Sequence, residues 1–143
     1  MYLDLVGHLI GGQLVRAQRA HQRQGLELLK RMGLYSGQEM LLLSLQREDG
    51  MTQSQLAALH HLDLSTITRV VKRMEGSGLV EQRTDVEDAR IARVYLTEQG
   101  RKLCEPAWQV WLDLEKQLTQ GMTEAEKVLF WRLLETAASN LER

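Results

Sequence analysis

The sequence contains few of the residues on which covalent or special backbone constraints depend. Of its 143 residues, one is cysteine, one is proline and only 5% are aromatic. The single cysteine, Cys104, cannot form an internal disulfide, which argues against a disulfide-rich secreted domain and favours a reducing cytoplasm. The single proline excludes collagen-like and proline-rich chains. The core must therefore be built mainly from Leu, Val, Ile, Ala and Met.

Long apolar runs and an excess of one charge are also missing. No stretch approaches the roughly 18–20 apolar residues that span a bilayer. Residues 1–4 lack the basic and apolar start of a secretory signal, so we expect a cytoplasmic chain with no membrane association. The net charge is −1, and 43% of the residues are hydrophobic. This composition supports a folded globular chain of one domain or of two small layers sharing a core.

Apolar periodicity indicates helices over residues 3–47. The first helix has one apolar face, formed by Leu3, Val6, Ile10, Leu14 and Ala17. Gly7 and Gly11 lie four residues apart on this helix, which fits either a close approach of two helices or a loosely held first turn. Ser36, with Glu39 three residues later, predicts a capping box for a second, largely buried helix.

Two helices joined by a tight connector are predicted in the middle of the chain. Thr52 and Gln55 form a capping box at the start of the first of them. Asp63, after the connector, is placed to cap the second. The inner face of this second helix has the spacing i, i+3, i+4, i+7 and consists of Ile67, Val70, Val71 and Met74.

A hairpin and further helices complete the predicted order. Alternation over residues 79–83 and 92–96 indicates two strands separated by a polar loop. The chain then returns to helix, with Thr97 as its cap and Pro106 as a source of a kink. Two helices followed by a projecting hairpin describe a winged helix-turn-helix, so we expect a mainly α fold (α+β). The last helix carries a further apolar stripe, formed by Phe130, Leu133, Leu134, Ala137, Ala138 and Leu141.

The outer face of the second middle helix carries residue types that suit DNA. Between residues 64 and 74 there are three cations and no anion, whereas residues 98–143 hold eight acids against six Lys and Arg. A nearly neutral chain therefore presents a local positive strip to phosphates, although a solvated helix face would explain these charges as well. Such a helix fits the major groove, where base edges can be distinguished. The candidate DNA-binding residues here are Ser65, Thr66, Thr68, Arg69, Lys72 and Arg73.

A series of short motifs between residues 56 and 100 extends this pattern. They are Leu56-Ala57, Ser65-Thr66-Ile67-Thr68-Arg69, Gly78-Leu79-Val80, Arg83, Asp88-Ala89-Arg90 and Leu96-Thr97-Glu98-Gln99-Gly100. With them the chain resembles the MarR family of transcription regulators. The resemblance implies a winged helix-turn-helix DNA-binding domain over residues 35–100. It also implies a helical dimerisation region over residues 1–34 and 101–143.

The resemblance also implies roles for single residues. Ser65, Thr66, Thr68 and Arg69 would contact bases and phosphates in the major groove. Arg90, at the tip of the wing, would enter the minor groove with its guanidinium held by Asp88. Narrow minor grooves concentrate negative potential and attract arginine, so this role makes physical sense. Without the motif, Asp88 and Arg90 would be an exposed ion pair worth at most ~1 kcal/mol.

The partners implied by the resemblance are double-stranded DNA, a second copy of the chain and a small molecule. A homodimer would bind a palindromic operator, most simply as a repressor. Many members of the family respond to small aromatic or anionic effectors, for which the pocket candidates here are Arg16, Tyr35, Trp108 and Trp111. We expect no cofactor and no metal site.

Two other classes of function remain to be weighed. A winged-helix module that docks an acidic protein partner would show the same basic strip but no sequence preference on DNA. An enzyme is disfavoured, because the sequence has no phosphate-binding glycine loop, no nucleophile elbow and no metal-ligand cluster.

Overall fold

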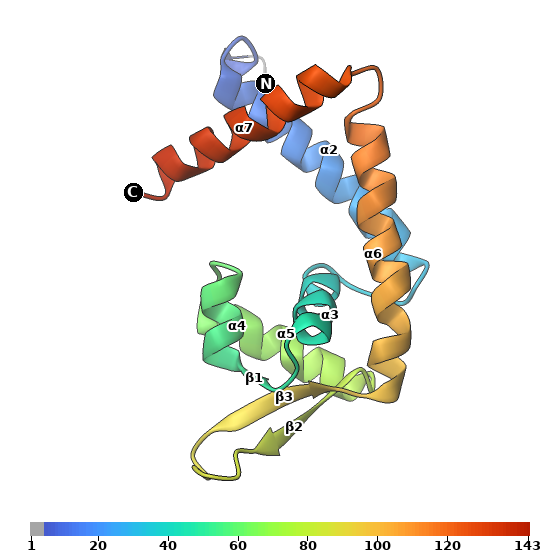
Figure 1. Cartoon of the computed structure of the whole chain (residues 1–143), viewed down its shortest axis with the longest axis vertical. Helices are drawn as coiled ribbons and strands as arrows, with labels where there is room; N and C mark the ends of the chain where they lie inside the picture. The colour runs from blue at the N-terminus through green and yellow to red at the C-terminus, as the bar shows by residue number, and fades with distance from the viewer. Residues whose placement is uncertain (1–4) are drawn as a thin grey trace.

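The computed structural model describes residues 5–143 and is mainly helical, with one small sheet. Leu3, part of the first predicted stripe, lies outside the described residues. Figure 1 shows α3, α4, α5 and the sheet gathered at one end of the molecule, with α6 leading away from them toward α2 and α7. This arrangement confirms the predicted winged helix-turn-helix. The elements are α2 (Ile10–Lys30), α3 (Gln38–Arg47), β1 (Met51–Thr52), α4 (Gln53–Leu59), α5 (Leu64–Gly76), β2 (Val80–Thr84), β3 (Ala92–Leu96), α6 (Glu98–Leu118) and α7 (Glu124–Leu141).

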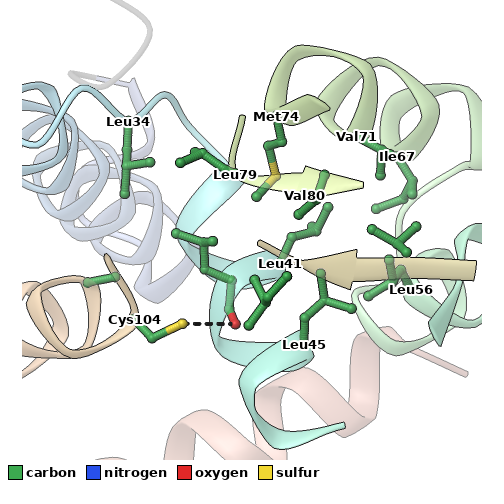
Figure 2. Packing of buried hydrophobic residues seen from close by; sticks show 14 of the residues in the cluster. Leu34, Leu41, Leu45, Leu56, Ile67, Val71, Met74, Leu79, Val80 and Cys104 are labelled. Atoms are coloured by element: carbon green, nitrogen blue, oxygen red, sulfur yellow. Dashed lines mark hydrogen bonds between the residues drawn. The ribbon is translucent and has the colours of Figure 1, made fainter. Parts of the chain in front are cut away.

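A closed apolar core holds together the part of the chain from residue 34 to residue 104, which we call the compact lobe. Figure 2 shows leucines of α3 and α4 meeting the inner face of α5 and the sheet. Three of the four residues predicted for that inner face are buried, and Val70 is partly buried. Side chains with at most 1% exposure include Leu34, Leu41, Leu42, Leu45, Leu56, Ile67, Val71, Met74, Val94 and Cys104.

The sheet has three antiparallel strands in the order β1-β3-β2. The two long strands pair from Val80 with Leu96 to Thr84 with Ala92, as the hairpin prediction requires. Strand β1 has only two residues and pairs Met51 with Val94. Strand β1 is not predictable from the sequence pattern, because two residues are too few to show alternation.

Three of the predicted helix caps are present. Thr52 and Gln55 form a full capping box at the start of α4. The Asp63 side chain accepts a hydrogen bond from the backbone N–H of Thr66, and Thr97 accepts one from the N–H of Gly100. These caps satisfy backbone donors that a helix start would otherwise leave unpaired.

The cap predicted at Ser36 is wrong. The N-cap of α3 is Gly37, whose φ is 87°, and no side chain caps this helix. The chain turns here through the left-handed region, which glycine adopts at little cost. The side chain of Gln38 reaches back instead, and its Oε1 accepts a hydrogen bond from the Tyr35 N–H at 3.2 Å. Glu39 consequently points inward and is buried.

The first long helix, α2, starts later than the apolar stripe suggested. A turn over residues 7–9 precedes it. The glycine that matters is Gly12, because a Cβ there would lie 2.0 Å from the carbonyl oxygen of Val6, whereas Gly11 faces open space. The close approach is therefore between α2 and its own preceding segment. At the other end of the chain, α6 is assigned as one continuous helix through Pro106.

The last helix, α7, contains no buried residue. Its apolar side chains are largely open to solvent, including Val128 at 70%, Trp131 at 66% and Leu133 at 49% exposure. Within residues 5–143, no helix is both long enough and apolar enough to cross a membrane.

Candidate nucleic-acid interface

The start of α5 is organised by the carboxylate of Asp63. Thr66 donates to it twice, from Oγ1 at 2.6 Å and from its backbone N–H at 3.2 Å. The Ser65 hydroxyl donates to it as well. These hydrogen bonds, from the Ser65 and Thr66 side chains above all, lower the pKa of Asp63 to about 2. Both hydroxyl hydrogens are thereby committed to Asp63, which leaves their oxygen lone pairs as acceptors.

Further along α5, the exposed face carries the predicted cations. Arg69, Lys72 and Arg73 are all exposed, and within residues 5–143 none of the three forms an ion pair. The guanidinium carbon of Arg73 lies 4.2 Å from the ring centroid of Tyr35. This cation–π contact restrains Arg73 without neutralising it, so the strip keeps its positive charge.

At the wing, Asp88 holds the guanidinium of Arg90 through two parallel hydrogen bonds. Arg90 Nε lies 3.0 Å from Oδ1 and Nη2 lies 3.0 Å from Oδ2. The backbone N–H of Arg90 also donates to Oδ1 at 3.0 Å. These bonds lower the pKa of Asp88. The Arg90 side chain remains 89% exposed, so three of its five N–H donors stay available to a ligand.

The base of the wing is fixed by Asp85 and Arg93. Arg93 Nε donates to Asp85 Oδ2 at 2.6 Å, and its Nη1 donates to the carbonyl oxygen of Gly50 at 3.0 Å. The other Asp85 oxygen accepts the backbone N–H groups of Glu87 at 2.8 Å and Asp88 at 3.0 Å. The Arg93 hydrogen bond and these N–H groups lower the pKa of Asp85 to about 2. Sequence reasoning missed this role, because Asp85 resembled one more acid in a polar loop.

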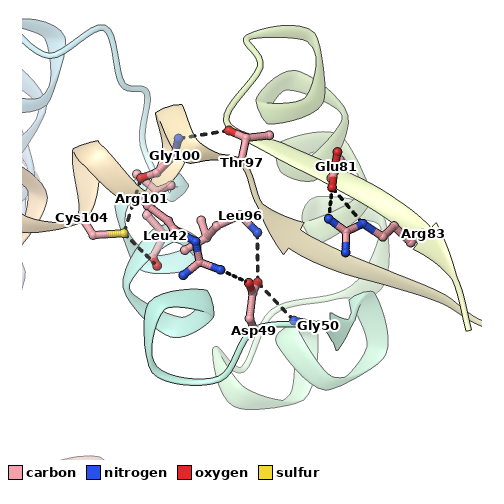
Figure 3. A network of polar contacts seen from close by, with 10 residues as sticks. All are labelled: Leu42, Asp49, Gly50, Glu81, Arg83, Leu96, Thr97, Gly100, Arg101 and Cys104. Atoms are coloured by element: carbon pink, nitrogen blue, oxygen red, sulfur yellow. Dashed lines mark hydrogen bonds and ion pairs between the residues drawn. The ribbon is translucent and has the colours of Figure 1, made fainter.

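Asp49 connects the sheet to α6. Its Oδ1 accepts the backbone N–H of Leu96 at 2.9 Å and that of Gly50 at 3.2 Å, and Arg101 of α6 pairs with Oδ2. Figure 3 shows these bonds converging at the point where β3 passes into α6, beside the Thr97 cap. The wing and α6 are therefore joined by polar contacts as well as by the chain.

A groove with a volume of about 670 Å³ lies between the compact lobe and α6. Trp108 and Trp111, two of the four predicted effector residues, line it together with Met40, Leu43, Ser44 and His60. His60 Nε2 and Ser44 Oγ are 2.8 Å apart, and burial, followed by the charge of His61, lowers the pKa of His60. Arg16 lies on the exposed surface of α2, and neither Arg16 nor Tyr35 lines this groove.

A smaller cavity of about 230 Å³ lies on the other side of Trp111, against α2. Glu39 reaches it with 8% exposure, and its Oε2 has no hydrogen-bond partner among residues 5–143. Burial raises the pKa of this carboxyl group. The His21 and Trp111 rings pack beside it with centroids 5.5 Å apart. Sequence reasoning missed this site, because the spacing of Ser36 and Glu39 predicts a capping role for Glu39 instead.

Comparison with known proteins places this geometry in a family. The MarR family model matches residues 34–92. The HTH-type transcriptional repressor IacR of Pseudomonas putida is 34% identical over 127 residues, which cover 87% of this chain and 76% of that protein.

Solved structures agree with that match. A crystal structure of MarR is 30% identical, has a TM-score of 0.79 and covers 94% of this chain and 91% of its own. A MarR mutant from E. coli, crystallised in complex with operator DNA, is 28% identical with a TM-score of 0.82, covering 94% of this chain and 98% of its own. The chain therefore belongs to the MarR family, and it is a DNA-binding transcriptional regulator rather than an enzyme.

Proposed function

We propose that the protein is a homodimeric repressor that binds a palindromic operator and releases it when a small effector binds. The observation that carries the proposal is the Arg90 guanidinium, which Asp88 holds in a fixed orientation while 89% of the side chain stays exposed. An exposed arginine that is already oriented on a projecting hairpin suits the minor groove, because it enters without losing much conformational freedom.

The outer face of α5 supplies the major-groove contacts in this proposal. Ser65, Thr66 and Thr68 lie toward the start of the helix, where base edges would be reached. Arg69 is the candidate for a base or phosphate contact. Lys72 and Arg73 follow along the helix and contact phosphates, which set the position on the duplex but carry no sequence information.

The proposed second copy would cover α7, none of whose residues is buried in the part of the chain from residue 5 to residue 143. Its exposed apolar side chains would be covered by the same surfaces of another chain, together with α2 and the end of α6. This assigns residues 1–34 and 101–143 to dimerisation and residues 35–100 to DNA binding. Twofold symmetry would place the two α5 helices about one helical turn of DNA apart, roughly 34 Å.

The effector would occupy the groove between the compact lobe and α6. Trp108 and Trp111 of α6 offer aromatic surface there, and Arg47 of α3 also lines the groove and offers a cation for an anionic group. In the proposed dimer, the distance between the two compact lobes can vary. A ligand that binds one such arrangement more tightly than another increases the fraction of dimers in that arrangement. The relative IacR is named a repressor, which supports repression as the result of operator binding here. Occupancy of the operator would then be lost when the effector binds.

The experiment that tests this function is selection of bound duplexes from a random pool, followed by affinity measurements on the selected duplex. We expect a palindromic sequence and affinity that falls steeply with salt. Arg69→Ala and Arg90→Ala should each weaken binding by roughly 1–3 kcal/mol per half-site. Lys102→Ala is the control, because it removes an exposed cation near the start of α6 that pairs with Glu98 and lies outside both α7 and the assigned DNA-binding residues.

Two results would contradict the proposal. If Arg69→Ala and Arg90→Ala both bind as tightly as the unchanged protein, the assigned residues do not form the interface. If every duplex binds equally well, the basic strip is a docking surface for something other than an operator.

A further inference from the structure

Four polar side chains from α5, α4 and β2 form one continuous hydrogen-bonded chain. Thr68 Oγ1 donates to Gln53 Oε1 at 2.6 Å. Gln53 Nε2 donates to Gln82 Oε1 at 3.0 Å, and Gln82 Nε2 donates to Glu75 Oε1 at 2.7 Å. The chain therefore starts in the middle of α5, crosses α4 and β2, and returns to the last turn of α5.

The direction of every bond in this chain is set by Glu75. An ionised carboxylate has no hydrogen to donate, so Gln82 must present its NH₂ group to Glu75. The carbonyl end of the Gln82 amide then faces Gln53, which must in turn offer its own NH₂ group. The carbonyl oxygen of Gln53 is left for Thr68, whose hydroxyl must donate.

The consequence concerns the side of Thr68 that faces solvent. A threonine hydroxyl has one hydrogen and two lone pairs, so it can normally pair with either a donor or an acceptor on a base edge. Here the hydrogen already points inward to Gln53. Only lone pairs remain for a ligand, and they accept hydrogen bonds.

We propose that Glu75, acting through Gln82 and Gln53, makes Thr68 an acceptor-only reader that selects bases carrying an amino group in the major groove. Those bases are adenine, with its N6 amino group, and cytosine, with its N4 amino group. Glu75, Gln82 and Gln53 are positioning residues in this scheme. The inference rests on the proposed function, because it requires α5 to lie in the major groove.

The test begins with the duplex selected from the random pool. Thr68→Val keeps the shape of the side chain and removes the hydroxyl. The operator position at which this variant loses its preference among the four bases is the position that Thr68 contacts. The unchanged protein should there separate adenine and cytosine from guanine and thymine on one strand by on the order of fivefold, the size expected of one net hydrogen bond.

Deleting the amino group from the DNA identifies which partner donates. The selected adenine is replaced by purine, or the selected cytosine by 2-pyrimidinone. We expect a loss of about fivefold with the unchanged protein and a clearly smaller loss with Thr68→Val, because the bond is absent in that variant.

Glu75→Gln tests the relay itself. The new amide can donate or accept, so the chain can reverse and the Thr68 hydroxyl can donate outward. Discrimination at that one operator position should fall toward unity, while preferences at other positions are kept. Gln53→Ala, which cuts the chain next to Thr68, should relax the same position. Glu81→Gln on β2 is the control, because it removes the same charge from a carboxylate that pairs with Arg83 instead.

Three results would overturn the inference while leaving the proposed function intact. They are full discrimination by Glu75→Gln, no position that responds to Thr68→Val, and an amino deletion that costs both proteins equally. Failure of the unchanged protein to select any sequence would overturn the proposed function itself, and the inference with it.

Discussion

The compact lobe and α7 differ sharply in how they bury apolar surface. In the lobe, leucines such as Leu42 and Leu45 are 0% exposed within a single chain. In α7, which also carries four leucines, no residue is buried. Because burial of apolar surface is the main source of folding free energy, contacts within one chain stabilise the lobe directly. The proposed second copy would supply the burial that α7 lacks among residues 5–143.

The largest expected effect is in the core of the lobe. Leu42→Ala should lower the free energy of unfolding by about 2–5 kcal/mol, because it removes buried methyl groups and leaves a cavity. The loss should not depend on protein concentration. Leu133→Ala, the same change on the exposed face of α7, should matter only where chains associate. Urea unfolding followed by circular dichroism at two protein concentrations measures both.

One result would contradict this difference between the compact lobe and α7. If Leu42→Ala and Leu133→Ala change stability equally at every protein concentration, α7 is supported in the same way as the lobe, and the comparison is mistaken.

The next effect concerns association through α7. Leu134→Lys places a charge on the exposed apolar face and should shift the protein from dimer to a 16.4 kDa monomer in light scattering. Affinity for a two-site operator should fall about 100-fold or more, because binding of the second lobe is no longer intramolecular.

Gln46→Lys introduces the same side chain at an exposed position of α3, in the compact lobe, and serves as the control. A Leu134→Lys protein that remains dimeric would show that this face of α7 is not the contact between copies.

The smallest expected effect is a pH dependence inside the groove. The pKa of folded His60 lies below 6.5, chiefly because of burial. The unfolded chain therefore binds more protons near that pH, and stability should fall modestly as pH drops below about 6.5. His60→Gln keeps a hydrogen-bonding group near Ser44 and should reduce this dependence. Melting temperatures at pH 5.5 and 7.5 check it.

His61→Gln is the matched control. Because His61 is exposed, this variant should keep most of the pH dependence of stability. If the melting temperatures of the unchanged protein and of His60→Gln depend on pH equally, His60 is not the group responsible.

The features predicted correctly from sequence are those encoded by neighbouring residues. The Thr52 capping box, the Asp63 cap and the inner face of α5 each depend on spacings of three or four residues. The features that escaped prediction join distant positions. Asp49 contacts Leu96 and Arg101, which lie 47 and 52 residues away, and no local pattern marks such pairs.

The candidate site shows the same division. The sequence marked the motif from Asp88 to Arg90, and the structure brings the two side chains together. It did not show that Tyr35, a proposed effector residue, supports Arg73 instead of lining the groove. The roles of these residues toward DNA remain predictions that the variants above address.

The junction at the start of α6 has a mechanical consequence. A Cβ on Gly100 would lie 2.1 Å from the carbonyl oxygen of Leu79, so the helix touches the backbone at the foot of the hairpin with no slack between them. From there α6 runs for 21 residues, or about 30 Å at 1.5 Å per residue. A tilt of about 10° at its far end would swing the wing through roughly 5 Å, more than the ~3.4 Å between successive base pairs. Small rearrangements between distant helices would thus be amplified into a mismatch with the DNA.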